Sequence, residues 1–250
     1  GYFYHDMVQA DGDEEILFFP SSFRRAIKYG QRDAANEILR TEVLARLKQE
    51  KPVTVVTYPD ALAEKVVSQK SLDERMLCLR IGQHIDTEVI TGELVKYGFH
   101  RVDYVYEPGQ FAMRGSILDV YSFASEYPYR IDFFGDEIDS IRTFEVDSQL
   151  SKEKKDAVSI VPELSEASDG DVCLLEFVPE TCVLWVKDLM WVRERIQTVH
   201  DEVFSPQAVQ AYEGEETDWV NLRKKLISGP DFLQKALSFR RIDFGHKAAG

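Results

Sequence analysis

Positive charge is scarce in this chain, and its scarcity limits what the protein can bind. The 250 residues contain 44 Asp and Glu against 30 Lys and Arg, a formal net charge of −14. Residues 81–150 alone hold thirteen acidic and five basic side chains, a net of −8. Because nucleic-acid affinity comes largely from Lys and Arg that neutralise phosphates, the sequence argues against a broad DNA-gripping surface.

Cysteine is also rare, and long apolar runs are absent. The three cysteines, Cys78, Cys173 and Cys182, are widely spaced, which is typical of free thiols in a reducing compartment and disfavours a zinc site. No apolar run reaches the length of a membrane span, and residues 1–15 lack the pattern of a secretory signal. We therefore predict a cytoplasmic protein with no membrane partner.

The sequence patterns of several enzyme classes are missing. There is neither a phosphate-binding GxxxxGK[ST] loop nor a GxGxxG motif, and the five histidines are scattered. The acidic side chains of Asp132, Asp136, Glu137 and Asp139 lack the spacing of a calcium loop, and we interpret them as a solvated hairpin tip. We predict no catalytic residue, no metal site and no cofactor in this chain.

What is present is the hydrophobic patterning of an α/β protein. The chain is 44% hydrophobic, enough to form a core. The patterns predict strands at 14–20, 53–57 and 76–81, with helices at 32–49 and 59–67 between them. This order is typical of part of a parallel α/β sheet. After residue 151 we predict strands at 157–161, 173–177 and 182–186, a helix capped by Asp188, and short helices at 219–227 and 231–237 separated by Gly229–Pro230.

A compact α+β domain is predicted to be inserted into the α/β domain. Asp86 caps a helix that ends at Gly98, and a strand at 100–106 follows. The segment 106–151 then predicts three mostly antiparallel strands joined by tight turns, with Gly135–Asp136 as the hairpin turn. The predicted divisions are the first part of the α/β domain (1–82), the inserted α+β domain (83–150) and the second part of the α/β domain (151–250).

One strand of the inserted domain carries an aromatic residue on its polar face. Alternation of side chains places Ile131 and Phe133 on one face, and Arg130, Asp132 and Phe134 on the other. Arginine and aromatic side chains are common at the centres of protein–protein interfaces. The pattern therefore favours a docking surface over a catalytic cleft.

Four motifs follow one another between residues 107 and 150: PGQFAMRG, ILDVY, YRIDFFGDEIDSIR and DSQ. In this combination the chain resembles the domain that UvrB shares with the bacterial transcription-repair coupling factors. The sequence EVDSQLS favours the coupling factors over UvrB. The likeness is strong over residues 83–151 and weaker on either side.

The resemblance implies a fragment from the N-terminal region of a coupling factor, with a UvrB domain 1-like α/β part and an inserted UvrB domain 2-like part. It implies that the inserted domain binds UvrA through Arg114, Arg130 and Phe134, in transcription-coupled nucleotide excision repair. The two arginines then pair with carboxylates on UvrA, and the phenyl ring fills an apolar recess. A C-terminal domain of the parent protein is expected to cover this surface.

The same resemblance assigns the other activities of the parent to domains outside this chain. RNA polymerase and DNA binding belong to those domains, as do ATP and Mg in a helicase-like motor. The fragment itself is therefore expected not to be an enzyme. A UvrB-like damage-recognition fragment, direct nucleic-acid binding and a hidden hydrolase remain the alternatives.

The residues also leave structural alternatives open at each site. Arg130 can instead pair with Asp132 or with an acid on a neighbouring strand, and Arg114 can do the same. Phe134 can be a core residue displaced by a β-bulge before Gly135.

A second cluster of arginines lies near the N-terminus. Arg24 and Arg25 are interpreted as surface residues rather than DNA contacts, because two arginines do not make a patch.

Overall fold

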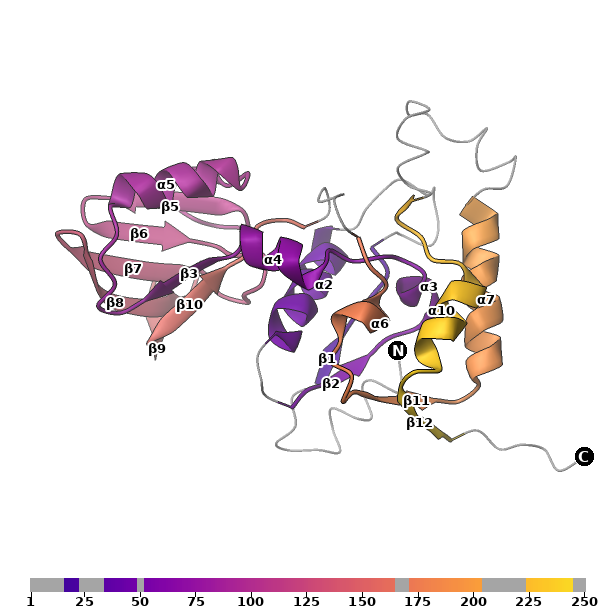
Figure 1. Ribbon diagram of the computed structural model, residues 1–250. Helices are drawn as coiled ribbons and strands as arrows, with labels where there is room; N and C mark the ends of the chain where they lie inside the picture. The colour runs from indigo at the N-terminus through magenta and orange to yellow at the C-terminus, as the bar shows by residue number, and fades with distance from the viewer. Residues whose placement is uncertain (1–15, 23–33, 49–51, 165–170, 204–223, 245–250) are drawn as a thin grey trace, which may run out of the picture. The chain divides into compact units, whose positions relative to one another are not determined.

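The chain forms two compact units in the computed structural model. One comprises residues 1–69 with 167–250, and the other residues 70–166. The structure describes residues 16–22, 34–48, 52–164, 171–203 and 224–244, whose helices and strands are labelled in Figure 1. Arg24, Arg25 and most of the helix predicted at 219–227 lie outside the described residues.

The first unit contains a strand–helix–strand arrangement, as predicted. Strand β1 (Ile16–Phe18) pairs in parallel with β2 (Thr54–Val56), and helix α2 (Ala34–Leu47) lies between them in sequence (Figure 1). The side chains of β2 are half-buried rather than buried on both faces, because β2 pairs within a sheet of only two described strands.

The remainder of the first unit packs around helix α7 (Leu189–Val203). This helix contacts α3 (Pro59–Leu62) and α10 (Gly229–Ala236), and a parallel pair of strands, β11 (Val183–Val186) and β12 (Arg240–Asp243), lies in the same unit. The cap predicted for α7 is confirmed, since the Asp188 carboxylate accepts a hydrogen bond from the backbone N–H of Trp191 at 2.9 Å.

Two of the predicted elements in this unit are wrong. The helix predicted at 59–67 ends at Leu62, because residues after it form β-bridges elsewhere in the unit. The strand predicted at 173–177 is the short helix α6 (Leu174–Phe177), whose first turn closes when Glu176 accepts a hydrogen bond from the backbone N–H of Cys173 at 2.9 Å. A run this short carries too little periodicity to distinguish a buried strand from a helical turn.

The helix predicted at 231–237 begins two residues earlier, so that Gly229–Pro230 lies inside it. The pair forms the first turn of α10, with Ser228 accepting a hydrogen bond from the backbone N–H of Asp231 as the cap. Proline suits the first turn of a helix because its missing N–H has no partner there.

The second unit is built on a six-stranded sheet. The strands follow the order β4 (His100–Arg101), β5 (Gln110–Arg114), β6 (Ile117–Val120), β7 (Tyr129–Phe134), β8 (Glu137–Phe144) and β9 (Ser151–Lys155). The first pair is parallel and the others are antiparallel, so the prediction of a mostly antiparallel sheet is confirmed. The prediction of three strands in 106–151 is wrong, because four strands, β5 to β8, lie within this segment.

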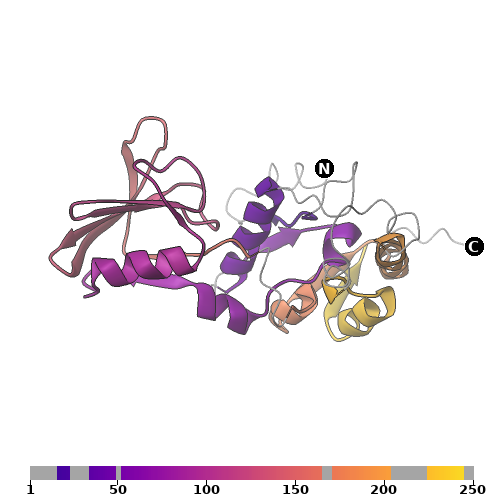
Figure 2. The ribbon, with the colours of Figure 1, turned by 90° about the horizontal axis from the view of Figure 1, so that it is seen from above.

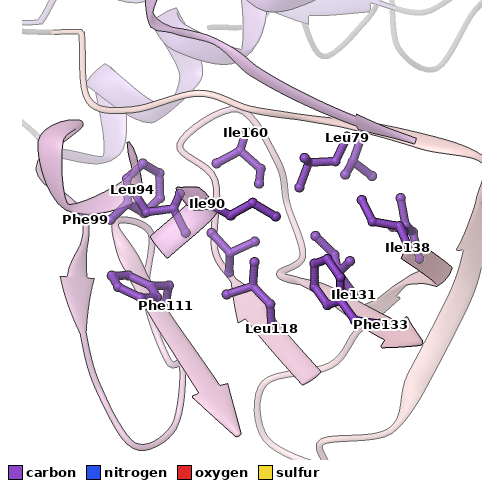
Figure 3. Packing of buried hydrophobic residues seen from close by; sticks show 13 residues of the cluster. Leu79, Ile90, Leu94, Phe99, Phe111, Leu118, Ile131, Phe133, Ile138 and Ile160 are labelled. Atoms are coloured by element: carbon purple, nitrogen blue, oxygen red, sulfur yellow. The ribbon is translucent and has the colours of Figure 1, made fainter. Parts of the chain in front are cut away.

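One face of this sheet is covered by helix α5 (Thr87–Lys96) and by the antiparallel pair β3 (Leu77–Arg80) and β10 (Ala157–Ile160), as Figures 2 and 3 show. The buried side chains between them include Leu79, Ile90, Leu94, Phe99, Phe111, Leu118, Ile131, Phe133, Ile138 and Ile160. The caps predicted for α5 are confirmed: Asp86 accepts from the N–H of Glu88 at 2.7 Å, and Gly98 follows the helix with φ +82°.

The compact unit is wider than the predicted domain of 83–150. Strand β3 was expected to continue a parallel sheet, but it pairs antiparallel with β10, and Leu79, Val158 and Ile160 enter the core of the second unit. The unit therefore spans residues 70–166. From the sequence, the segments of β3 and β10 were assigned to the flanking α/β domain, because a pairing between distant strands leaves no local signal in the sequence.

Candidate docking surface on the six-stranded sheet

The outer face of the sheet, opposite the face that α5 covers, carries an exposed aromatic ring at the end of β7. Alternation holds along this strand, because Ile131 and Phe133 are buried whereas Phe134 is 81% exposed. The alternative, that Phe134 is a core residue, required a β-bulge in this strand. A register shift does follow Asp132, but it does not turn the ring inward. The prediction that Phe134 faces water is confirmed.

The hairpin tip beside Phe134 is anchored by the segment before α5. Gly135 adopts φ +66° in the turn, as its position between β7 and β8 predicts. The backbone N–H of Gly82 donates to the carbonyl of Ile138 at 2.8 Å, and the N–H of Ile85 donates to the carbonyl of Asp136 at 2.8 Å. The turn and the β8 side of the hairpin are therefore paired with this segment, which holds the backbone beside the ring.

A side-chain contact closes the same tip. The Nδ1 of His84 lies 3.1 Å from a carboxylate oxygen of Asp136, and this hydrogen bond lowers the pKa of Asp136 below its usual 3.8. Because both side chains are exposed, the backbone pairs hold the tip and the ion pair adds little.

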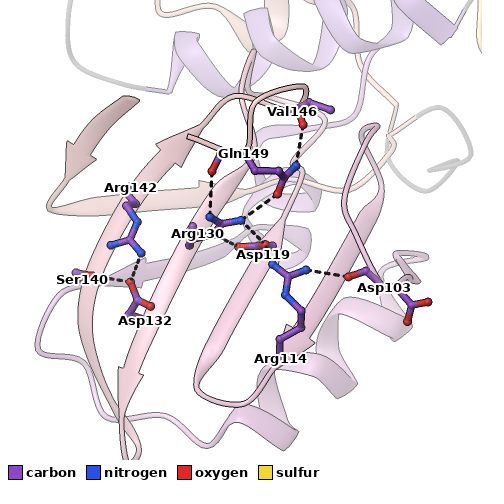
Figure 4. Close-up of polar contacts among 9 residues, drawn as sticks. All are labelled: Asp103, Arg114, Asp119, Arg130, Asp132, Ser140, Arg142, Val146 and Gln149. Carbon is purple, nitrogen blue, oxygen red and sulfur yellow. Dashed lines mark hydrogen bonds and ion pairs between the residues drawn. The ribbon is translucent and has the colours of Figure 1, made fainter. Parts of the chain in front are cut away.

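Cross-strand register places the charged residues of the outer face in rows. In one row Asp119 pairs with Arg130, which pairs with Arg142. In the next row Asp132 lies between Ile117 and Ser140. The arginines therefore find their carboxylates on neighbouring strands, Arg130 with Asp119 and Arg142 with Asp132, as Figure 4 shows.

Asp119 is the centre of this arrangement. The carboxylate is 1% exposed and receives hydrogen bonds from the guanidinium groups of both Arg114 and Arg130. Arg130 binds in a bidentate fashion, with Nε to Oδ1 at 2.7 Å and Nη2 to Oδ2 at 2.8 Å. A buried carboxylate needs such partners, because an unpaired charge is expensive to bury.

The guanidinium of Arg130 is fully engaged within the unit. It lies over the ring of Phe144 at 4.3 Å, and its Nη1 and Nη2 donate to the backbone and side-chain oxygens of Gln149 at 3.3 and 3.1 Å. The hydrogen bond to Asp119 raises the pKa of Arg130 above its usual value. The side chain is 14% exposed, so it is positioned by its neighbours and has little surface to offer a partner.

Arg114 is more accessible. Its side chain is 37% exposed, although it pairs with Asp119, donates to the carbonyl of Asp103 at 2.8 Å and lies 5.0 Å from the ring centre of Tyr104. An open hollow of about 650 Å³ lies beside it, lined by Arg101, Val102, Asp103, Tyr104, Met113 and Arg114.

The structure brings two of the predicted site residues onto one face and changes the expected partner of one of them. Arg130 and Phe134 share the outer face of β7, but Arg130 takes the alternative partner, an acid on a neighbouring strand. Asp132 instead pairs with Arg142 at 2.9 Å. Whether Arg114, Arg130 and Phe134 contact a partner stays a prediction.

The sequence reasoning missed Asp119. A signal was present, because ILDV places one carboxylate between Leu118 and Val120 in an otherwise apolar strand. A lone acid at such a position predicts a cation on the neighbouring strand.

The described part of the chain offers little that points to other kinds of site. No group of three or more His, Cys, Asp or Glu suited to a metal ion occurs among the described residues. Within the same residues, no helix is both long and apolar enough to cross a bilayer.

Comparison with known proteins assigns the second unit. Residues 77–165 match the model of the UvrB interaction domain. The chain is 35% identical over 123 residues to the transcription-repair-coupling factor of Escherichia coli (strain K12), a match covering 49% of this chain and 11% of that protein. Identity to the factor of Bacillus subtilis (strain 168) is 29% over 157 residues, which cover 63% of this chain and 13% of that protein. Identity to the factor of Haemophilus influenzae is 28% over 151 residues, which cover 60% of this chain and 13% of that protein.

The similarity to the coupling factors extends beyond the matched domain, since 123 to 157 residues align and the domain spans 77–165. The matches cover about an eighth or less of the length of those relatives. The resemblance seen in the sequence is thereby confirmed: residues 77–165 match the UvrB interaction domain, and the chain is similar in sequence to the transcription-repair coupling factors.

Proposed function

We propose that the second unit is a docking module that recruits the repair protein UvrA in transcription-coupled nucleotide excision repair. The family match and the names of the relatives support a role in repair. The observation that carries the proposal is Phe134, an 81% exposed phenyl ring at the tip of a hairpin whose backbone is hydrogen-bonded. Exposed aromatic side chains are costly in water and common at the centres of interfaces.

Phe134 is the apolar anchor in this proposal. The backbone on both sides of the ring is already paired, so binding does not have to order a loop. Burying the ring in a recess on the partner then contributes through the hydrophobic effect.

The two arginines have different roles. Arg130 has its donors committed to Asp119 and Gln149, so it positions the charged cluster instead of reaching across the interface. Arg114, at 37% exposure, retains the surface needed to approach a partner carboxylate. This revises the expectation that both arginines pair equally with UvrA.

Calorimetric titration with purified UvrA tests the proposal. Phe134→Ala should weaken binding at least about thirtyfold, which corresponds to about 2 kcal/mol for a hot-spot residue. Trp185→Ala is the matched control, because Trp185 is also a largely exposed aromatic residue but lies in the first unit. Equal affinity of the Phe134→Ala variant and the unsubstituted chain would overturn the proposal.

The parent protein provides the wider context of this proposal. We assign RNA polymerase binding, DNA translocation with ATP and Mg, and masking of this surface by a C-terminal domain to parts of the parent outside this chain. Support for that assignment comes from the coupling-factor relatives, of which the matches cover 11% to 13%.

A further inference from the structure

The row that contains Arg130 continues into a line of cations. Arg130 pairs across the strands with Arg142, and Arg142 pairs with Lys154 on β9. Three cationic residues thus lie side by side on three adjacent strands of one face. From Arg130 to Lys154 the line spans roughly 10 Å, two interstrand spacings.

This line is unusual for the unit that carries it. The second unit has nineteen acidic and eleven basic residues, and 11 − 19 gives a net charge of −8. Like charges directly opposite one another destabilise a sheet. A local arrangement that opposes stability is expected where a residue serves binding.

The three cations differ in how far their donors are satisfied. Arg130 uses Nε, Nη1 and Nη2. Arg142 makes one ion pair, from Nη2 to Asp132 at 2.9 Å, and its buried Nε–H has no acceptor among the described residues. Lys154 is exposed and makes no ion pair within the described part of the chain. Unused donor capacity therefore increases from Arg130 outward to Lys154.

We propose that Arg142 and Lys154 bind an acidic segment of the same protein that docks on Phe134. This inference rests on the function proposed above and names the chemistry of the partner. Its Asp and Glu carboxylates would lie about 13 Å, measured along the strand direction, from its recess for the ring, and one to two strands to the side. Arg142 offers a planar guanidinium and Lys154 a point charge.

A short acidic protein segment fits this surface better than nucleic acid does. The cations occupy a single line, and Asp132, Asp139 and Glu145 lie close by in sequence on β7, on β8 and just after it. A long polyanion that extended past the line would meet those carboxylates, whereas a peptide can place its charges on the line alone.

Association kinetics with UvrA test this inference. Lys154→Glu should slow association about three- to tenfold at low salt, and the difference should shrink at high salt because rim charges act through steering. Lys70→Glu is the control: Lys70 is an exposed lysine of the same unit that lies in α4 (Gln69–Arg75), away from the sheet. Lys154 makes no ion pair with the residues that the structure describes, so the variant should fold normally, and removal of a cation opposite Arg142 should slightly raise its melting temperature.

The outcomes separate this inference from the proposed function. If the chain binds UvrA and Phe134→Ala weakens binding while Lys154→Glu and Arg142→Gln leave the association rate unchanged, the inference fails and the proposed function stands. Absence of UvrA binding by the unsubstituted chain would overturn both. Tight, salt-dependent binding of a duplex DNA oligonucleotide that Lys154→Glu abolishes would overturn the acidic-protein assignment.

Discussion

At the scale of single residues, some side chains are satisfied inside the second unit and others face water. Asp119 is almost fully buried and joins two arginines, whereas Phe134 touches little of its own unit. The residues that hold the surface together therefore differ from those proposed to face a partner. Substitutions of the first kind should lower stability, and substitutions of the second kind should weaken binding.

Asp119→Asn should destabilise the second unit by about 3 kcal/mol, because it leaves two guanidinium groups without their shared carboxylate. Urea denaturation followed by circular dichroism measures the change. Phe134→Ala is the control and should unfold within about 0.5 kcal/mol of the unsubstituted chain, since exposed side chains rarely affect stability more. A stable Asp119→Asn variant would show that the carboxylate does not organise the face.

The cysteines should differ strongly in reactivity. Cys173 is 1% exposed, and burial raises the pKa of its thiol to about 11, so only about one thousandth is thiolate at pH 8. Cys78 is exposed. A thiol reagent at pH 8 should therefore modify Cys78 first and Cys173 only after denaturation. Rapid labelling of Cys173 in the native protein, detected by mass spectrometry, would contradict its burial.

At the scale of helices and strands, helix caps and the alternation of side chains were predicted correctly, whereas short elements such as α6 and the pairing of distant strands were not. Asp86 and Asp188 identified the starts of α5 and α7 because a cap acts within three residues. Alternation placed Phe134 outward for the same reason. The pairing of β3 with β10, and the contact of Asp119 with Arg130, depend on register between strands, which a single sequence does not display.

Two glycines with positive φ allow a matched test of local packing. Gly109 and Gly135 have φ values of +85° and +66°. A Cβ at Gly109 would lie 2.9 Å from the ring of Phe123, whereas one at Gly135 would meet open space. Gly135→Ala should cost about 1 kcal/mol of stability from backbone strain alone, and Gly109→Ala should cost at least about 1 kcal/mol more from the clash. Denaturant titration of the two variants measures both; equal losses would contradict the packing described at Gly109.

At the scale of the whole molecule, the second unit should fold without the first. A fragment of residues 70–166 contains β3 and β10 and therefore its whole core. A fragment of residues 83–150 lacks Leu79, Val158 and Ile160 and should be unfolded or molten, because three buried aliphatic side chains contribute several kcal/mol, about 1.5–3 each. Amide NMR spectra distinguish the two; a well-dispersed spectrum of the shorter fragment would contradict the wider boundary.

In the proposed complex, the ring at position 134 lies against UvrA. Photo-crosslinking with benzoylphenylalanine in place of Phe134 tests this most directly, with the same group in place of Trp185 in the first unit as the control. We predict a covalent adduct with UvrA from position 134 and none from position 185. An adduct from position 185 alone, or equal yields from both positions, would contradict the account.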